Sequence, residues 1–124
     1  MTMLTKTRSK RTDRSFNAEI SSLEKQMLNH TAWQGEISLS EAALLLDGQK
    51  PYTFVLSSGF DRQHYIMSFV SEKNVVKHKN IRIVVFEGKT CFMNGGTGIP
   101  CSKLDDLIVC SLKVSANVCQ PLSI

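Results

Sequence analysis

The chain has 124 residues, 42% of them hydrophobic, which suits one globular domain with a modest core and leaves no room for a second. It contains no run of about 18 apolar residues and no apolar segment after its basic start, which argues against a membrane span and a secretion signal. The formal net charge of +4 lies within the first fourteen residues, because the rest of the chain carries ten basic and ten acidic residues.

Residues 1–14 are predicted to form a basic, disordered tail. The alternative is a tail that contacts nucleic acid or acidic lipid, but it has no aromatic residue to stack on bases, and we expect no nucleic-acid partner. Residues 15–30 follow with apolar side chains at helical spacing, which predicts a helix that packs on the domain or extends from it. These apolar side chains are Phe16, Ile20, Leu23 and Met27. The segment that they span contains too few heptads to favour a coiled coil.

A capping box marks the start of the next helix. The hydroxyl of Ser38 can accept from the amide of Glu41, and the Glu41 carboxylate can accept from the amide of Ser38. The leucine-rich segment Leu39–Leu46 is therefore predicted to be a short helix. Asp47 and Gly48 end it, because glycine tolerates the left-handed conformation found after helices.

The centre of the chain is predicted to be a sheet. Tyr52–Leu56 is a nearly continuous apolar run, as expected for a strand covered on both faces. His64–Val70 alternates two sets of side chains, and Val76–Val84 ends in a strongly β-prone stretch. The sequence Glu87–Lys89 is typical of a hairpin turn, and it leads into a fourth strand at Thr90–Met93.

Residues 94–98 are predicted to form a flexible glycine-rich loop. Ser102 is then expected to cap a second helix over Lys103–Leu112, which shows the 3.6-residue period. The remaining residues have no clear pattern. One helix before the sheet and one after it predict an α+β fold, a central antiparallel sheet flanked by two helices, with the additional N-terminal helix outside a domain over residues 31–124.

Residues 33–124 resemble a Src-homology-2 (SH2) domain along their whole length. The opening motif of that family, with tryptophan and glycine before the capped helix, is matched by Trp33, Gly35, Ile37, Ser38, Glu41, Ala42, Leu44 and Leu45. Later motifs follow in the family's order and at nearly its spacing. They are matched by Thr53–Leu56, Tyr65–Phe69, Val76–Arg82, Ile99–Ile108 and Val118–Leu122.

The resemblance implies an SH2 fold and a module that binds phosphotyrosine peptides. In the family, one arginine on the first central strand and another at the start of the first helix hold the phosphate. Here Ser57 stands at the strand position and Leu39 at the helix position. A hydroxyl cannot replace the paired, charged hydrogen bonds of a guanidinium, so the phosphate pocket is expected to be atypical.

The residues expected at the two halves of the binding site follow from the resemblance. Phosphotyrosine is expected to contact Ser57, Ser58, Gly59, Arg62, Lys77 and His78, and the rest of the peptide to contact Lys79, Asn80, Gly95, Gly96 and Thr97. Arg62 can replace the missing charge, or it can be an ordinary exposed loop arginine. His78 can orient a ligand or belong to the core. Lys77 and Lys79 share one face of their strand, and His78 points to the other.

No enzyme motif occurs in the chain, and neither a cofactor nor a metal site is expected. The four cysteines form no Cys-x-x-Cys pair and are expected to be free thiols in a reducing compartment, the cytoplasm. By analogy, a divergent domain of this kind suits a bacterial or viral effector in a host cell. Two functions remain: recognition of a phosphotyrosine peptide through an atypical pocket, and binding of an extended peptide independently of phosphate.

Overall fold

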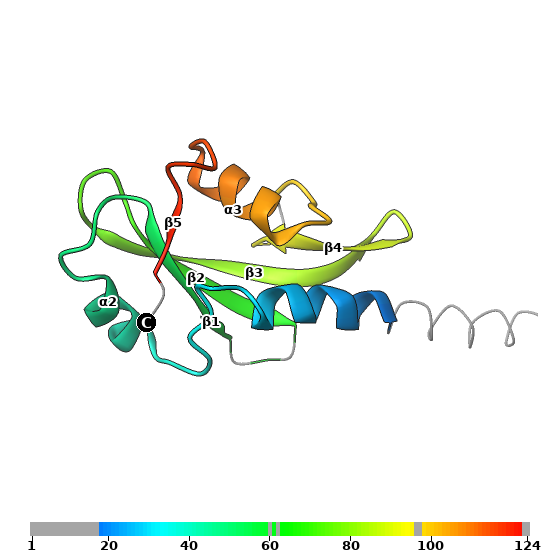
Figure 1. Cartoon of the computed structure of the whole chain (residues 1–124). Helices are drawn as coiled ribbons and strands as arrows, with labels where there is room; N and C mark the ends of the chain where they lie inside the picture. The colour runs from blue at the N-terminus through cyan, green and yellow to red at the C-terminus, as the bar shows by residue number, and fades with distance from the viewer. Residues whose placement is uncertain (1–17, 60, 62, 96–97, 123–124) are drawn as a thin grey trace, which may run out of the picture.

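The computed structural model describes residues 18–59, 61, 63–95 and 98–122 (Figure 1). The predicted tail therefore lies outside the described residues, as do the first three residues of the predicted N-terminal helix. A helix occupies residues 18–28. The elements that follow are α2 (Leu39–Leu46), β1 (Thr53–Ser58), β2 (His64–Val70), β3 (Val76–Phe86), β4 (Lys89–Asn94), α3 (Leu104–Leu112) and β5 (Gln120–Pro121).

The five strands form one sheet in the order β4-β3-β2-β1-β5. Strands β1 to β4 pair in antiparallel fashion with their neighbours in sequence, which confirms the predicted central sheet. The register places Ser57 opposite Ile66, and Ile66 opposite Asn80, so these three residues form one row across the sheet. The short strand β5 pairs with β1 in parallel and was not predicted, because two residues leave no periodic signal.

The outer edge of β1 is covered by two distant segments of the chain. The N–H of Leu122 donates to the carbonyl of Phe54 at 2.9 Å, which continues the pairing with β5. Further along the same edge, the N–H of Leu56 donates to Ala32 at 2.9 Å, and the N–H of Gln34 donates to Leu56 at 2.8 Å. One strand is thus bordered by residues from both ends of the described chain.

Helices α2 and α3 lie on opposite faces of the sheet, as predicted (Figure 1). Because successive residues of a strand point to opposite faces, Val55 of β1 packs with Ala42 and Leu46 of α2 while Phe54 packs with the α3 cluster. We call these two sides the α2 face and the α3 face. The face to which a strand residue belongs decides which pocket it can line.

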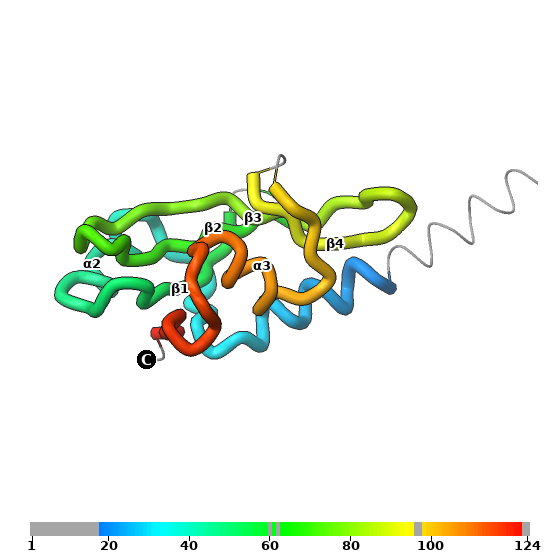
Figure 2. Tube along the Cα trace, turned by 90° about the horizontal axis from the view of Figure 1, so that it is seen from above, coloured from blue at the N-terminus to red at the C-terminus, as the bar shows by residue number. Residues whose placement is uncertain are grey.

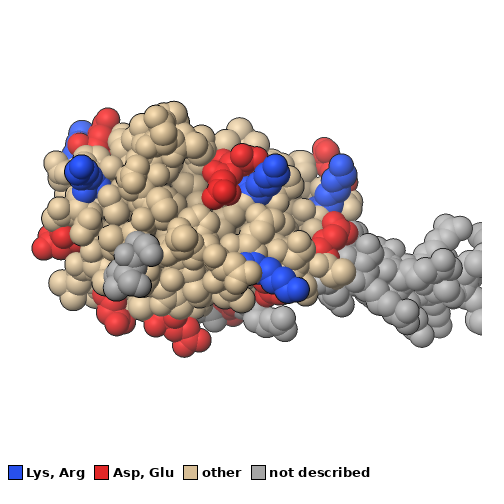
Figure 3. Space-filling view, in the orientation of Figure 1, with Lys and Arg blue, Asp and Glu red and all other residues tan. Residues whose placement is uncertain are grey.

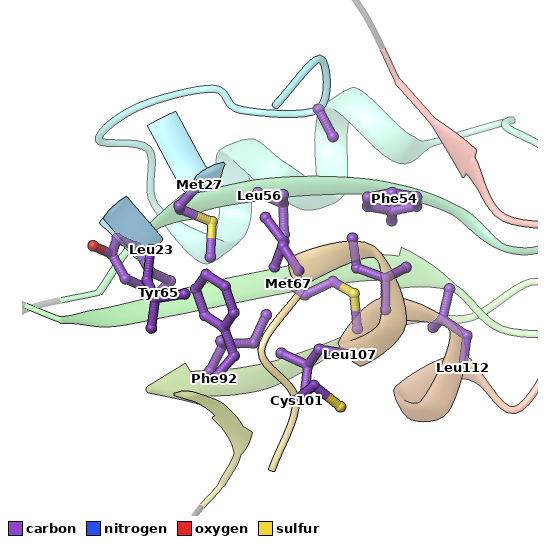
Figure 4. Close-up of a cluster of buried hydrophobic side chains, with 14 of the residues drawn as sticks. Leu23, Met27, Phe54, Leu56, Tyr65, Met67, Phe92, Cys101, Leu107 and Leu112 are labelled. Atoms are coloured by element: carbon purple, nitrogen blue, oxygen red, sulfur yellow. The ribbon is translucent and has the colours of Figure 1, made fainter. Parts of the chain in front are cut away.

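The larger core lies on the α3 face and includes the N-terminal helix. Met27 of that helix is fully buried, and Leu23 is 6% exposed. Figure 4 shows side chains from the helix, the sheet and α3 pointing toward one another. The labelled members are Leu23, Met27, Phe54, Leu56, Tyr65, Met67, Phe92, Cys101, Leu107 and Leu112. The N-terminal helix therefore packs on the domain.

None of the described helices is long and apolar enough to cross a bilayer.

The two flanking helices begin in different ways. At α2 the predicted capping box is present: Glu41 donates its N–H to the Ser38 hydroxyl, and the Ser38 N–H donates to the Glu41 carboxylate, both at 3.0 Å. At α3 the prediction was wrong, because the N-cap residue is Lys103 and no side chain at that position caps the helix.

A side chain from the N-terminal helix takes over this role at α3. Oε1 of Gln26 accepts the N–H of Leu104 at 3.0 Å, and Nε2 of Gln26 lies 3.4 Å from the carbonyl of Ser102. The helix of residues 18–28 thus lies alongside the start of α3 (Figure 2). The free amides of a helix start need acceptors, and here the acceptor comes from a residue 78 positions earlier.

Candidate functional site

A hollow of about 550 Å³ lies on the α2 face where β1 ends. It is formed by the segment before α2, the end of β1 and the middle of β2, and we call it the α2-side pocket. Its lining residues are Glu36, Ile37, Ser38, Leu39, Ser58, Gly59 and Ile66. The lining combines three apolar residues with two serines, one glycine and one glutamate, and no lysine, arginine or histidine is among the described residues that form it.

Two of the predicted phosphate-site residues, Ser58 and Gly59, line this pocket, and Ser57 lies beside it. Ser57 is 1% exposed and stands opposite Ile66, so its hydroxyl belongs to the floor of the α2 face. Gly59 comes very close to β2: a Cβ atom there would lie 2.9 Å from the carbonyl oxygen of His64. The end of β1 therefore requires glycine, and this close approach shapes the rim of the pocket.

His78 also lies on the α2 face, since it stands opposite Ser68. Its Nδ1 and the Oγ of Ser68 are hydrogen-bonded at 2.7 Å. Burial lowers the pKa of His78 below its ordinary value of 6.5, which favours the neutral ring. The bond to Ser68 fixes the orientation of that ring on the α2 face.

Lys77 and Lys79 lie on the opposite face, as the alternation predicted. They stand opposite Phe69 and Met67, both members of the α3-face side of β2. Nζ of Lys79 donates to the carbonyl of Ser111 in α3 at 2.8 Å and lies 5.9 Å from the centre of the Phe69 ring. The sheet therefore separates Lys77 and Lys79 from Ser57 and His78.

A second hollow, of about 210 Å³, lies on the α3 face beside Lys79, and we call it the α3-side pocket. The amide of Asn94 donates to the hydroxyl of Ser111 at 3.2 Å, which ties β4 to α3 at its border. Ile99 is 69% exposed and lies at its rim. The lining residues are Lys79, Asn94, Gly98, Ile99, Leu107, Cys110, Ser111 and Lys113.

Between the two pockets runs an uncovered edge of the sheet. Strand β4 pairs with β3 from Ile81 to Phe86, and the N–H of Gly95 donates to the carbonyl of Asn80 at 2.9 Å. In the described sheet, residues Val76–Lys79 of β3 have no strand on their outer side. We call this segment the free edge of β3. Its last residue, Lys79, lines the α3-side pocket, and the α2-side pocket includes Ile66, which pairs with the next residue, Asn80.

Three of the predicted site residues, Arg62, Gly96 and Thr97, lie outside the described residues. The roles assigned to them from the sequence stay predictions. Conversely, sequence reasoning did not point to Ile99 and Asn94, which line the α3-side pocket. Arg82 of β3 is an even-numbered residue like His78 and Asn80 and so shares their face, the α2 face.

Both ring nitrogens of His30 have hydrogen-bond partners. His30 accepts the N–H of Ala32 at Nδ1, 3.0 Å away, which leaves the proton on Nε2 to point at Asp105, 3.3 Å away. The Nε2 contact joins the segment after the helix of residues 18–28 to α3, and the Nδ1 bond is local. Burial raises the pKa of the Cys119 thiol, which lies with His30 along a third hollow of about 590 Å³. Within the described part of the chain, no three His, Cys, Asp or Glu residues cluster as metal ligands.

Charges are mixed on the surface shown in Figure 3, where acidic and basic side chains alternate between wide uncharged areas. That face has no broad patch of one sign, in keeping with the equal numbers of acidic and basic residues after residue 14.

No model of a protein family matches the chain, and no curated protein matches it. Among solved structures it is similar to the SH2 domain of a CRK/CRKL homologue from Monosiga brevicollis. That match has a TM-score of 0.48 and 22% identity and covers 61% of this chain and 67% of the other. It is also similar to the SH2 domain of the human proto-oncogene protein VAV1, with a TM-score of 0.48 and 20% identity, over 63% of this chain and 53% of that one. Both are SH2 domains, the family that residues 33–124 resemble in sequence.

Proposed function

We propose that this chain is a peptide-binding signalling module that recognises a phosphotyrosine peptide of a partner protein through an atypical pocket. The observation that carries the proposal is the free edge of β3, Val76–Lys79, with the α2-side pocket on one face of the sheet and the α3-side pocket on the other. An extended peptide that crosses this edge can place one side chain in each pocket.

The free edge suits a peptide because its backbone groups have no partner strand. Exposed N–H and C=O groups of an edge strand bind extended chains irrespective of their sequence, and pockets beside the edge then select side chains. The α2-side pocket has the apolar walls of Ile37, Leu39 and Ile66, which suit an aromatic ring. Ser38 belongs to the same lining, and its hydroxyl, which accepts the Glu41 N–H, can still donate to a polar group on that ring.

The α3-side pocket is the proposed site for a second peptide side chain. Ile99 and Leu107 offer apolar contact there, and Lys113 adds a positive charge at the border. Lys79 is already bonded to Ser111, so its ammonium group is less available to a ligand. We expect this pocket to take a small apolar or acidic side chain that lies a few residues from the aromatic one.

The second candidate function is peptide binding that does not depend on phosphate. A specific observation favours it: the lining of the α2-side pocket includes the Glu36 carboxylate and no basic residue among those described. A carboxylate repels a phosphate dianion, whereas an unmodified tyrosine, phenylalanine or leucine would not be repelled. Ser57, where the family carries an arginine, is consistent with this alternative.

The partner is therefore proposed to be a protein segment in a reducing compartment such as the cytoplasm. All four cysteines are free thiols, and that of Cys110 is exposed. An exposed thiol of this kind persists where glutathione and thioredoxin keep cysteines reduced.

The test compares two fluorescein-labelled peptide libraries by fluorescence polarisation with the full chain. Both carry a fixed central tyrosine between random positions, and they differ only in its phosphorylation. Tighter binding of the phosphorylated library supports phosphotyrosine recognition, and equal binding supports the phosphate-independent module. Binding of neither library would refute both. Ile99→Ser should weaken peptide binding without unfolding, and Leu44→Ser, at a residue 76% exposed on α2, is its matched control.

A further inference from the structure

We propose that Arg82 supplies the positive charge that binds the peptide's aryl phosphate on the α2 face. This inference rests on the function proposed above and names the charged residue of that site. Arg82 stands opposite His64 in β2, and the N–H of Gly59 donates to the carbonyl of His64 at 2.8 Å. Gly59, His64 and Arg82 therefore form one row across the sheet, and Gly59 belongs to the α2-side pocket.

The neighbouring row of residues on the α2 face also connects β3 with the pocket. Ser57, Ile66 and Asn80 form that row on the same face, and Ile66 also lines the pocket. Adjacent strands lie about 4.8 Å apart, so Arg82 is roughly 10 Å from Gly59 across two strands. Arginine is among the longest side chains, and its guanidinium can extend over Ile66 toward the pocket.

One nitrogen of the Arg82 guanidinium lacks a hydrogen-bond partner. Its Nε is buried and has no hydrogen-bond partner, although the residue as a whole is half-buried. Buried polar groups nearly always have partners, and one without a partner calls for an explanation such as a ligand. No described carboxylate forms an ion pair with Arg82, since the ion pair recorded among the described residues joins His30 and Asp105. Once the Arg82 side chain turns its buried Nε outward, a phosphate would accept from Nε and a neighbouring Nη together, which is the paired geometry that guanidinium favours.

The other basic residues of β1, β2 and β3 are two histidines and two lysines. Lys77 and Lys79 lie on the α3 face, and burial lowers the pKa of His78, whose Nδ1 is hydrogen-bonded to Ser68. Among the residues of β1, β2 and β3, Arg82 is the one arginine or lysine on the α2 face. Since Arg82 lies on β3 and the apolar residues Ile37, Leu39 and Ile66 line the pocket, the proposed ligand needs a hydrophobic spacer between backbone and phosphate. Phosphotyrosine has this spacer and phosphoserine lacks it.

The experiment measures polarisation of the phosphorylated and unphosphorylated tyrosine libraries, and of a phosphoserine library, with the full chain. Arg82→Gln should weaken binding of the phosphotyrosine library about tenfold to a hundredfold, the usual effect of losing charged hydrogen bonds. Binding of the unphosphorylated library should not change. Arg82→Lys should recover part of the loss, because it keeps the charge without the planar fork. Lys25→Gln, at an exposed lysine of the N-terminal helix that lines neither the α2-side nor the α3-side pocket, is the matched control and should bind like the wild type.

Several outcomes would overturn the role of Arg82. One is a loss of phosphopeptide binding in Arg62→Ala with none in Arg82→Gln. Another is equal binding of the phosphorylated and unphosphorylated libraries by the wild type, which would leave a peptide-binding module without phosphate recognition. Tight binding of the phosphoserine library would contradict the aromatic spacer.

Binding of no library would refute the proposed function. A second measurement then tests separately whether Arg82 binds an aryl phosphate. Phenyl phosphate is titrated into 15N-labelled protein while the Nε–H resonance of Arg82 is followed by NMR. A saturable shift that inorganic phosphate produces only weakly supports an aryl phosphate site. No shift overturns it. Circular dichroism and thermal unfolding of each variant exclude loss of fold as the cause.

Discussion

Gln26 in the N-terminal helix and Leu104 at the start of α3 are joined by a hydrogen bond of 3.0 Å, in which the Leu104 N–H donates to the Gln26 side chain. Gln26 therefore performs for α3 the task that Ser38 performs for α2. The bond couples the helix of residues 18–28 to the domain at a point where the helix start would otherwise lack a side-chain acceptor.

Gln26→Ala should lower the free energy of unfolding by about 1 kcal/mol, the usual cost of losing a helix cap. Lys25→Ala changes an exposed neighbour on the same helix and should have little effect. Urea unfolding monitored by circular dichroism measures both. Equal stabilities of the two variants would show that Gln26 does not act as a cap in solution.

The N-terminal helix should contribute to the core through Met27. Met27 is fully buried, whereas the adjacent Leu28 is 51% exposed. Met27→Ala should therefore cost about 2–5 kcal/mol because it leaves a cavity, and Leu28→Ala should stay within about 0.5 kcal/mol of the wild type. Thermal unfolding of this pair is the measurement. A mild Met27→Ala variant would mean that the helix does not dock as described.

Stability should decline as the pH falls through the region where histidine titrates. Burial lowers the pKa of His78 in the folded state, so the unfolded chain gains a proton first as the pH drops below 6.5. This contribution to stability is therefore complete above the unfolded pKa and is lost as the pH falls toward the lower folded value. His78 remains largely exposed, and the effect should be small.

His78→Gln provides the comparison for this pH effect, because glutamine does not titrate. The midpoint of thermal unfolding, measured between pH 7.5 and pH 5 in steps, should fall more steeply for the wild type than for the variant. Parallel curves would show that the ring of His78 titrates alike in the folded and unfolded chains.

Removal of residues 1–14 tests the prediction, made from sequence, that they form a solvated tail. The deletion should leave the melting temperature nearly unchanged, because a solvated tail adds no packing. Differential scanning calorimetry of the shortened and full chains gives the answer. A fall of several degrees would indicate that the tail docks on the domain.

Local signals predicted most of the fold. The capping box at Ser38 and Glu41 fixed the start of α2 because both partners lie within one turn. The cap of α3 could not be predicted in this way, since its acceptor, Gln26, is 78 residues distant. The same limit applies to β5, whose two residues become a strand only through pairing with β1.

The candidate site was predicted less completely than the fold. The alternation of side chains along β3 correctly placed Lys77 and Lys79 on one face of the sheet and His78 on the other, because this alternation depends only on neighbouring residues of one strand. Placing Arg82 in a row with Gly59 required the register across three strands, which depends on how distant segments pair. The sequence resemblance drew attention to Ser57 and Arg62, and the residue pairing drew it to Arg82.

The outer edge of β1 pairs with two segments of the chain that the ribosome makes at different times. Residues 32–35 are available to pair with the end of β1 as soon as β1 itself exists, but residues 120–122 are made last among the described segments. Until then the backbone groups of Tyr52 and Phe54 that later accept from Gln120 and Leu122 remain open. The nascent domain thus carries a temporarily unpaired strand edge, the kind of surface that invites pairing with another chain. A chaperone that shields extended segments would act on it in this interval.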